Sequence, residues 1–133
     1  MPLSQHFTRR RDVLLHTTRG ARGHIDWFYN PSNIQRALNA ISILASEFTS
    51  STSYSTYGDT VIAIELVNEA YPQDAGSLKT LKEYYTDGYE VVKGYNEGTV
   101  VVIGDAFEGM GAWLDFMTTT AGFDGVAMDT VGD

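Results

Sequence analysis

The chain has 133 residues, of which 43% are hydrophobic and 20% are charged, and it contains no cysteine. This composition is typical of one small globular domain, and the absence of cysteine excludes both a disulfide framework and a thiolate metal site. No apolar run approaches the ~20 residues that cross a bilayer, so we expect no membrane span.

The net charge of −8 is distributed unevenly along the chain. Residues 1–36 carry a net charge of +4, whereas residues 37–133 carry −12. Phosphate binding needs clustered cations, so the acidic body argues against a nucleic-acid partner. It suits a neutral substrate or a cation.

Residues 1–24 show no usable periodicity, and we interpret them as an irregular basic N-terminal segment ahead of a domain over residues 25–133. The arginines of this segment fit three interpretations: a mitochondrial-type leader, a solvated basic arm, or the altered beginning of a longer protein. No apolar stretch typical of a secretory signal follows the first residue, so the localisation stays open. We interpret His6, His16 and His24 as ordinary loop histidines.

The first regular element is a helix predicted over residues 32–48. Apolar side chains recur there every three to four residues, beginning with Ile34 and Leu38, and this spacing gives one apolar helix face. Ser32 is the expected N-cap. The small polar residues 49–59 that follow predict a surface loop.

Residues 60–67, TVIAIELV, are apolar at nearly every position, which predicts a strand covered on both faces, as in a parallel sheet. A second helix is predicted over residues 77–95, where Leu81 and Tyr85 belong to a face of helical spacing. Gly94 offers a stop for this helix.

Residues 99–107, TVVVIGDAF, predict a second strand, and residues 125–130, GVAMDT, begin a third. A short helix is predicted between them, over residues 111–122. Its expected inward side chains are Trp113, Phe116 and Met117.

Helices and strands therefore alternate, which predicts an α/β fold with parallel strands joined by crossovers. In such folds catalytic groups gather at the carboxyl ends of the strands. Asn68 and Glu69 follow the first strand, Asp105 ends the second and Asp129 lies near the end of the third. An amide beside a carboxylate is too polar for the end of a buried strand without a functional role. Either aspartate taken alone is more often a helix cap or a loop residue.

Four blocks of the sequence, in order, resemble one enzyme family. VIAIELVNEA is similar to the strand-four signature of glycoside hydrolase family 5, in which an apolar strand ends in Asn-Glu-Pro. LKEYYTDGYEVVK followed by VVVIGDAFEGMGAWLDFM resembles the fungal exo-β-1,3-glucanases of that family. GHIDWFYNPSNIQRALNAISILASEF upstream and FDGVAMDT downstream are similar to the same enzymes. The resemblance covers roughly residues 23–130.

The resemblance implies part of a (β/α)₈ TIM barrel, roughly strands three or four to six, and a retaining hydrolase that removes glucose from the ends of β-1,3-glucan. Glu69 matches the family's acid/base, and Asn68 matches the amide that holds the sugar's 2-hydroxyl. The family's nucleophile is a Glu at the end of strand seven, so the resemblance implies a truncated chain that lacks it. It implies no cofactor and a partner that is a β-glucan or another neutral polysaccharide, and leaves the oligomeric state open. The family's members are secreted or associated with the cell wall.

The sequence departs from the family pattern near these residues. Ala70 stands where the family has Pro after the catalytic Glu. Glu65 is a position at which the family also has Glu, and we interpret it as a paired, buried structural carboxylate.

Two alternative functions stay open at this point. A β-1,4-glucanase or mannanase of the same family would share the Asn-Glu motif. A non-catalytic carbohydrate-binding remnant would use aromatic side chains as stacking surfaces, namely Trp27, Tyr71, Phe107 and Trp113. A dinucleotide site is rejected because the glycines of VVVIGDAFEGMG do not form G-x-G-x-x-G, and metal-dependent hydrolysis because there is no His pair at i, i+4.

Overall fold

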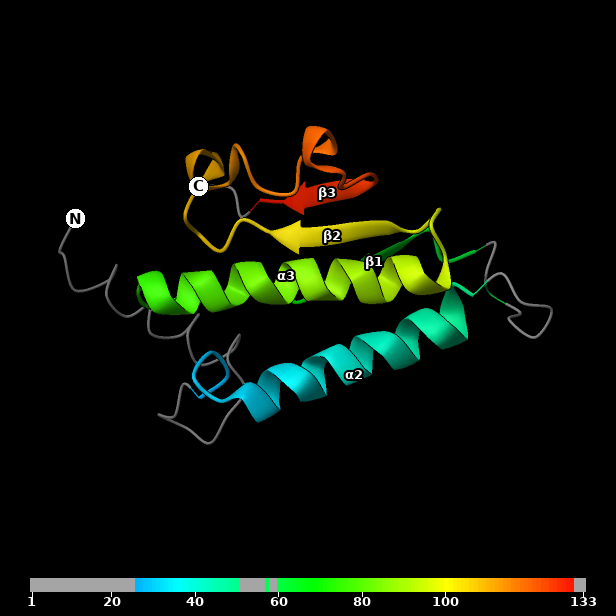
Figure 1. Ribbon diagram of the computed structural model, residues 1–133, viewed down its shortest axis with the longest axis horizontal. Coiled ribbons are helices and arrows are strands. Elements are labelled where there is room, and N and C mark those ends of the chain that lie inside the picture. Colours follow the sequence, from blue (N-terminus) through cyan, green and yellow to red (C-terminus); the bar gives the residue numbers. More distant parts are fainter. Residues whose placement is uncertain (1–25, 51–56, 58–59, 131–133) are drawn as a thin grey trace, which may run out of the picture.

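The computed structural model describes residues 26–50, 57 and 60–130, so the predictions for residues 1–24 and for the three histidines lie outside the described part. The described chain forms a small α/β domain with one three-stranded parallel sheet and two long helices. Figure 1 shows α3 packed beside the sheet with its axis along the strands, and α2 lying alongside α3. No helix in these ranges is both long and apolar enough to span a membrane.

The sheet has the order β1-β2-β3 and is parallel throughout, as the alternation of elements predicts. Its strands are β1 (Ala63–Glu65), β2 (Val100–Gly104) and β3 (Val126–Asp129). All three strands are shorter than the apolar runs that predicted them. Ala106 and Phe107, which the sequence places in the second strand, instead have positive φ angles of 57° and 60° and belong to the turn after β2.

The predicted helix at residues 32–48 is confirmed as α2 (Pro31–Phe48), but its expected N-cap is wrong. Asn30 caps the helix, and its side-chain oxygen accepts a hydrogen bond of 3.0 Å from the Ser32 N–H. Pro31 follows at the first helical position, where a missing N–H costs nothing and the fixed φ suits the helix. Ser32 therefore supplies a backbone donor to the cap and is not the cap itself.

The second predicted helix is confirmed as α3 (Ala75–Tyr95). A capping box begins it: the Asp74 carboxylate accepts from the Ser77 N–H at 2.7 Å, and the Ser77 hydroxyl accepts from the Asp74 N–H at 3.0 Å. The helix continues past Gly94, and its C-cap is Asn96.

The helix predicted at residues 111–122 is wrong. The segment contains two short 3₁₀ helices, η1 (Met110–Trp113) and η2 (Thr119–Ala121), separated by Met117 with a φ of 50°. The inward direction of the apolar side chains is nonetheless confirmed for Trp113 and Met117, which are 3% and 6% exposed, while Phe116 is only half-buried. The burial of a few large side chains, and not helical hydrogen bonding, therefore shapes this segment.

The sheet is covered on one face only, so the expectation of cover on both faces is wrong. Ile64, Val101 and Ile103 lie on the face toward α3 and are at most 8% exposed. On the opposite face, Ala63 and Ala127 are exposed. Because side chains alternate along a strand, this uncovered face also carries Glu65 and Asp129, each at the last position of its strand.

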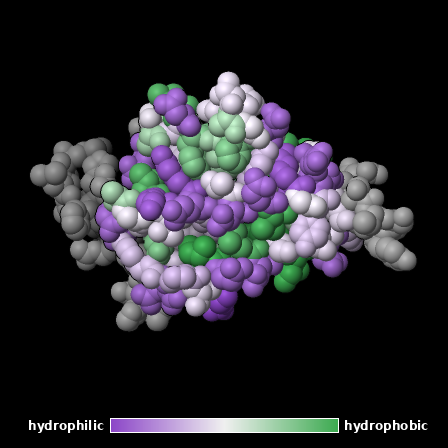
Figure 2. All heavy atoms as spheres, viewed as in Figure 1, coloured by the Kyte–Doolittle hydropathy of each residue, from purple (hydrophilic) through white to green (hydrophobic). Residues whose placement is uncertain are grey.

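The apolar core lies between the sheet and α3 and continues between α3 and α2. Figure 2 shows apolar side chains gathered in a band between the two helices, with hydrophilic residues on either side. Two polar contacts join α2 and α3 toward their C-terminal ends. The Ser42 and Tyr95 hydroxyls are 3.0 Å apart, and the Asn96 amide donates to the Thr49 carbonyl at 2.7 Å.

Three buried tyrosines of α3 bind the backbone of the sheet region. Tyr84 donates to the Leu66 carbonyl at 2.6 Å, just after β1. The Tyr85 hydroxyl both donates to the carbonyl and accepts from the N–H of Gly104 at the end of β2, each at 3.2 Å. Tyr89 binds the carbonyl and N–H of Asp124, ahead of β3, in the same way. The helix is therefore fixed to all three strands by directional contacts.

The close approach of α3 to the sheet generates a stability prediction. A Cβ at Gly88 would lie 2.8 and 2.9 Å from the two methyl carbons of Leu66, which is 4% exposed, whereas a Cβ at Gly94 would have no atom within 4 Å. We expect Gly88→Ala to lower the free energy of unfolding by about 1–3 kcal/mol, because the buried leucine must move. Gly94→Ala, the control in the same helix, should raise it by about 0.5–1 kcal/mol. Urea unfolding of both variants measures the difference, and equal effects would contradict this account of the packing.

Candidate functional site

The candidate site lies at the sheet edge where all three parallel strands end. Asn68 and Glu69 follow β1 in a turn, and both side chains are exposed. Neither forms a hydrogen bond or ion pair with another residue in the described ranges. Glu69 has a φ of 47°, a left-handed conformation that is uncommon for a residue other than glycine, asparagine or aspartate. The pair therefore projects from the strand end and is available to a ligand.

The turn that carries this pair is fixed on both sides. Leu66, before it, is 4% exposed and donates its N–H to the Val102 carbonyl at 3.0 Å. Ala70, after it, is 3% exposed, and Pro72 is also buried. The backbone is thus buried at Leu66 and again at Ala70, and the side chains of Asn68 and Glu69 between them are exposed to solvent.

Asp105 ends the second strand but does not present its carboxylate to this pair. It is 5% exposed, and its side chain accepts a hydrogen bond of 3.1 Å from the Phe107 N–H. Its carbonyl accepts from the Trp113 indole N–H at 2.8 Å. The interpretation of this aspartate as a loop residue is therefore the correct one, since its side chain and backbone both shape the turn after β2.

Glu65 is exposed, so the interpretation of a paired, buried structural carboxylate is wrong. Partial desolvation and the negative charges of Asp129 and Glu69 raise its pKa above the usual value. The strand register explains why the charge of Asp129 affects Glu65, because the two side chains share the uncovered face of the sheet. The negative charges of Asp129 and Glu69 therefore act on Glu65 at this edge of the sheet.

Two aromatic side chains lie beside the turn. The rings of Tyr71 and Phe107 are 5.6 Å apart in an edge-to-face arrangement, and both residues are half-buried. Of the other two aromatics named as stacking candidates, Trp113 belongs to the core and is 3% exposed. Trp27 is half-buried and packs edge-to-face against both Phe28 and Tyr84. Tyr71 and Phe107 are therefore the pair that lies next to the Asn68–Glu69 turn.

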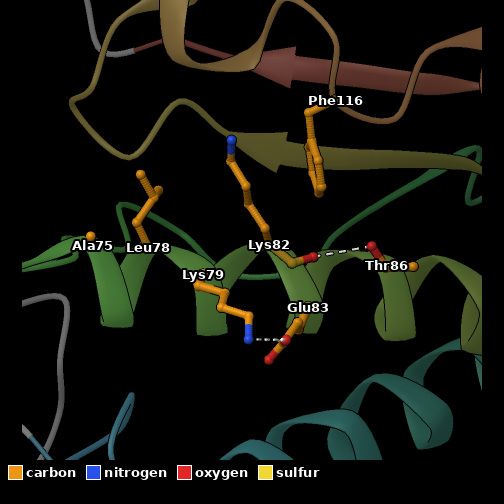
Figure 3. Close-up of a pocket in the computed structure, with 7 residues that line it drawn as sticks. All are labelled: Ala75, Leu78, Lys79, Lys82, Glu83, Thr86 and Phe116. Carbon is orange, nitrogen blue, oxygen red and sulfur yellow. Dashed lines mark hydrogen bonds and ion pairs between the residues drawn. The ribbon is translucent and has the colours of Figure 1, made fainter.

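A separate pocket lies between α3 and the segment that carries Phe116 (Figure 3). Phe116 closes one side of it, and the Lys82 ammonium lies 5.3 Å from the Phe116 ring centroid while donating to the Ala112 carbonyl at 3.0 Å. An exposed ion pair of 3.5 Å between Lys79 and Glu83 lines the other side. The pocket contains none of the residues that the sequence predicts as functional. Within the ranges given above, no group of three potential ligand side chains could hold a metal ion.

Tyr84 was not predicted as a residue of this region. The helical spacing of residues 77–95 placed Tyr85 on the inner face of α3, yet Tyr84 is equally buried and is the residue that binds the strand end before Asn68. The adjacent tyrosines in KEYYTD were the available signal, because one apolar helix face is wide enough to include two neighbouring positions.

The sequence is similar to one stretch of several fungal enzymes. It is 36% identical over 110 residues to the glucan 1,3-beta-glucosidase of Yarrowia lipolytica, an alignment that covers 83% of this chain and 25% of the relative. It is 37% identical over 112 residues to the glucan 1,3-beta-glucosidase of Blumeria graminis, and 32% identical over 103 residues to glucan 1,3-beta-glucosidase I/II of Saccharomyces cerevisiae. These alignments cover 84% and 77% of the chain, and 24% and 22% of the relatives. No protein-family model matches the sequence.

These similarities confirm the resemblance to fungal exo-β-1,3-glucanases. The chain spans about a quarter of the length of the curated relatives it matches.

The carboxylates at the sheet edge generate a prediction about pH. Because the pKa of Glu65 is raised in the folded state, the folded chain holds this proton more tightly than the unfolded chain does, and the stability from this group falls as pH rises through the raised value. We expect Glu65→Gln to raise the free energy of unfolding at about pH 7 by less than about 1 kcal/mol, since the group is exposed, and to change it little at about pH 3. Glu90→Gln, at an exposed position of α3, is the control, and urea unfolding at both pH values is the measurement. A loss of stability in Glu65→Gln at neutral pH would contradict the repulsion.

Proposed function

We propose that this chain carries the acid/base part of a retaining glycoside hydrolase site that acts on β-1,3-glucan. The observation that carries the proposal is the Asn68–Glu69 turn: an amide and a carboxylate, both exposed, at the carboxyl end of a parallel strand. The similarity to fungal glucan 1,3-beta-glucosidases over about four fifths of the chain supports the choice of chemistry.

The proposed mechanism gives each of the two residues one task. The Glu69 carboxylic acid protonates the glycosidic oxygen as the leaving sugar departs. The resulting carboxylate then removes a proton from the water that releases the bound sugar, so Glu69 returns to its starting state. Asn68 holds the 2-hydroxyl of the sugar, a contact that strengthens in the transition state.

The proposed fold of the whole site is a (β/α)₈ barrel of glycoside hydrolase family 5, to which this chain contributes roughly strands three or four to six. The uncovered sheet face supports this proposal, because the inner face of a barrel sheet is covered only when the strands close around it. Glu65 and Asp129 would then point into the barrel near its mouth.

The retaining mechanism also needs a second carboxylate, about 5–5.5 Å from the first. Asp105 is a poor candidate, since its side chain is engaged in the turn after β2. We therefore propose that the nucleophile comes from polypeptide other than this sequence, as the family resemblance implies. The wider family's activity on β-1,4-glucan or mannan remains the alternative within the same chemistry.

A chimeric enzyme tests the acid/base assignment. The 110 aligned residues of this chain would replace their counterparts in the Yarrowia lipolytica glucan 1,3-beta-glucosidase, and glucose release from laminaritriose would be measured. We expect Glu69→Gln to lower kcat about 10²–10⁴-fold, because proton transfer to the leaving group is lost. In the same variant, the first step of hydrolysis of a dinitrophenyl glucoside should slow far less, because its leaving group departs without a proton.

The matched control in the chimera is Glu108→Gln, since Glu108 is exposed and follows β2 at the same sheet edge. It should keep the parent rate on both substrates. Equal rates for Glu69→Gln and the control, or a folded chimera without glucosidase activity, would contradict the assignment.

The second candidate function is carbohydrate binding without catalysis, which the Tyr71–Phe107 pair favours. Its two half-buried rings adjoin the Asn68–Glu69 turn, and sugar rings present apolar faces on which aromatic side chains stack. The positive φ angles of Ala106 and Phe107 fix the direction of the Phe107 ring.

This candidate can be tested on the chain itself by NMR titration with laminaritriose. We expect Phe107→Ala and Tyr71→Ala each to weaken binding about tenfold, which is the effect of losing one stacked ring. Tyr95→Ala is the control, because Tyr95 is a partly exposed tyrosine at the opposite end of α3. Binding that survives Glu69→Gln but not these changes would indicate that recognition is separate from catalysis, whereas no response to either aromatic change removes the binding candidate.

A further inference from the structure

The backbone that precedes the Asn68–Glu69 turn is held by one buried hydroxyl group. Tyr84 is 1% exposed, and its hydroxyl donates to the Leu66 carbonyl at 2.6 Å. Leu66 lies one residue beyond β1, and its N–H makes a sheet-type bond to Val102. Tyr84 therefore satisfies the buried carbonyl at the point where the sheet stops providing partners.

The position of that hydroxyl is itself fixed. The Tyr84 ring packs edge-to-face against Trp27, with centroids 4.9 Å apart, and lies 6.1 Å from the ring of Tyr85. The adjacent Tyr85 hydroxyl is bound to Gly104 at the end of β2. A ring confined on two sides holds its oxygen in one place, and so it holds the Leu66 carbonyl as well.

The chain between Leu66 and Ala70 has little freedom left. Both residues are buried, at 4% and 3% exposure, and only three residues separate them. Within this span Glu69 adopts its positive φ of 47°. Because both ends are fixed, the direction in which the Asn68 and Glu69 side chains leave the backbone depends on where the Leu66 carbonyl is held.

We propose that Tyr84 is a positioning residue, which acts through the Leu66 carbonyl to set the geometry of Asn68 and Glu69 at the sheet edge. It touches neither side chain and takes no part in proton transfer. The chemical use of that geometry rests on the proposed function, whereas the geometry itself does not.

The test measures the position of Glu69 through its charge. In the wild-type chain partial desolvation raises the pKa of Glu65, and the negative charges of Asp129 and Glu69 raise it further. Carboxyl-detected NMR titration of Glu65, with and without Glu69→Gln, gives the size of the Glu69 contribution in each background. In a Tyr84→Phe background we expect the contribution of Glu69 to the Glu65 pKa to fall by about half. Coulomb coupling declines with distance and with solvent between the charges.

Tyr89→Phe is the matched control. It removes the same kind of buried hydroxyl from the same helix, but its partner is Asp124, ahead of β3 at the opposite end of the sheet. The coupling between the two glutamates should then equal the wild-type value. Equal coupling in the Tyr84→Phe and Tyr89→Phe backgrounds would overturn the proposal.

A second measurement needs no variant and can overturn the proposal even should Tyr84→Phe fail to fold. In the wild-type chain, the ¹⁵N order parameters of Asn68 and Glu69 should match those of β1, at about 0.85. Values below about 0.6 would show a turn that is not held and would overturn the proposal.

Neither measurement depends on hydrolysis. Should Glu69→Gln leave the chimera's hydrolysis unchanged, the proposed function fails while the coupling experiment still reports whether Tyr84 holds the turn. Conversely, intact acid/base chemistry with unchanged coupling in Tyr84→Phe removes only the positioning role.

Discussion

The structure depends on hydrogen bonds between the buried tyrosine hydroxyls of α3 and the backbone at the ends of the strands. A phenol oxygen removed from water must find a partner, and so must a backbone carbonyl at the end of a short buried strand. Tyr84, Tyr85 and Tyr89 meet both needs together, because each hydroxyl binds a different strand region. Such contacts are directional, so they fix the helix along its axis as well as against the sheet. Apolar packing alone would leave that register weakly defined.

Because α3 covers only one face of the sheet, the opposite face has a different composition. The buried side chains Ile64, Val101 and Ile103 point toward α3, and the other face carries alanines and half-buried valines with carboxylates at its carboxyl edge. Partial desolvation raises the pKa of Glu65, and the like charges of Asp129 and Glu69 at this edge raise it further. A fold selected only for stability would replace one of them. The proposed substrate site lies at this same edge, which is the place where parallel folds bind their substrates.

The sequence was sufficient to predict the elements whose signals are local and repeated. Both long helices and the parallel order of strands follow from apolar spacing and alternation, and Asn68 and Glu69 were located because polarity follows a buried strand so abruptly. The segment at residues 111–122 could not be predicted in this way. Its apolar residues have helical spacing, but burial of Trp113 and its bond to the Asp105 carbonyl determine the path instead. Tyr84 was missed for a related reason, since its role depends on a carbonyl 18 residues away.

The positions at which local sequence rules fail are concentrated beside the candidate site. Glu69, Ala106 and Phe107 have positive φ angles although none is glycine, and they follow the ends of β1 and β2. Each such conformation costs about 1–3 kcal/mol and persists only where the surrounding structure imposes it. Tyr84 and the buried Ala70 impose it at Glu69, and Asp105 with Trp113 imposes it in the next turn. Strain of this kind is expected where side chains must be aimed at a ligand, so the same contacts that stabilise the strand ends also account for the direction of the groups proposed to act on the glycosidic bond.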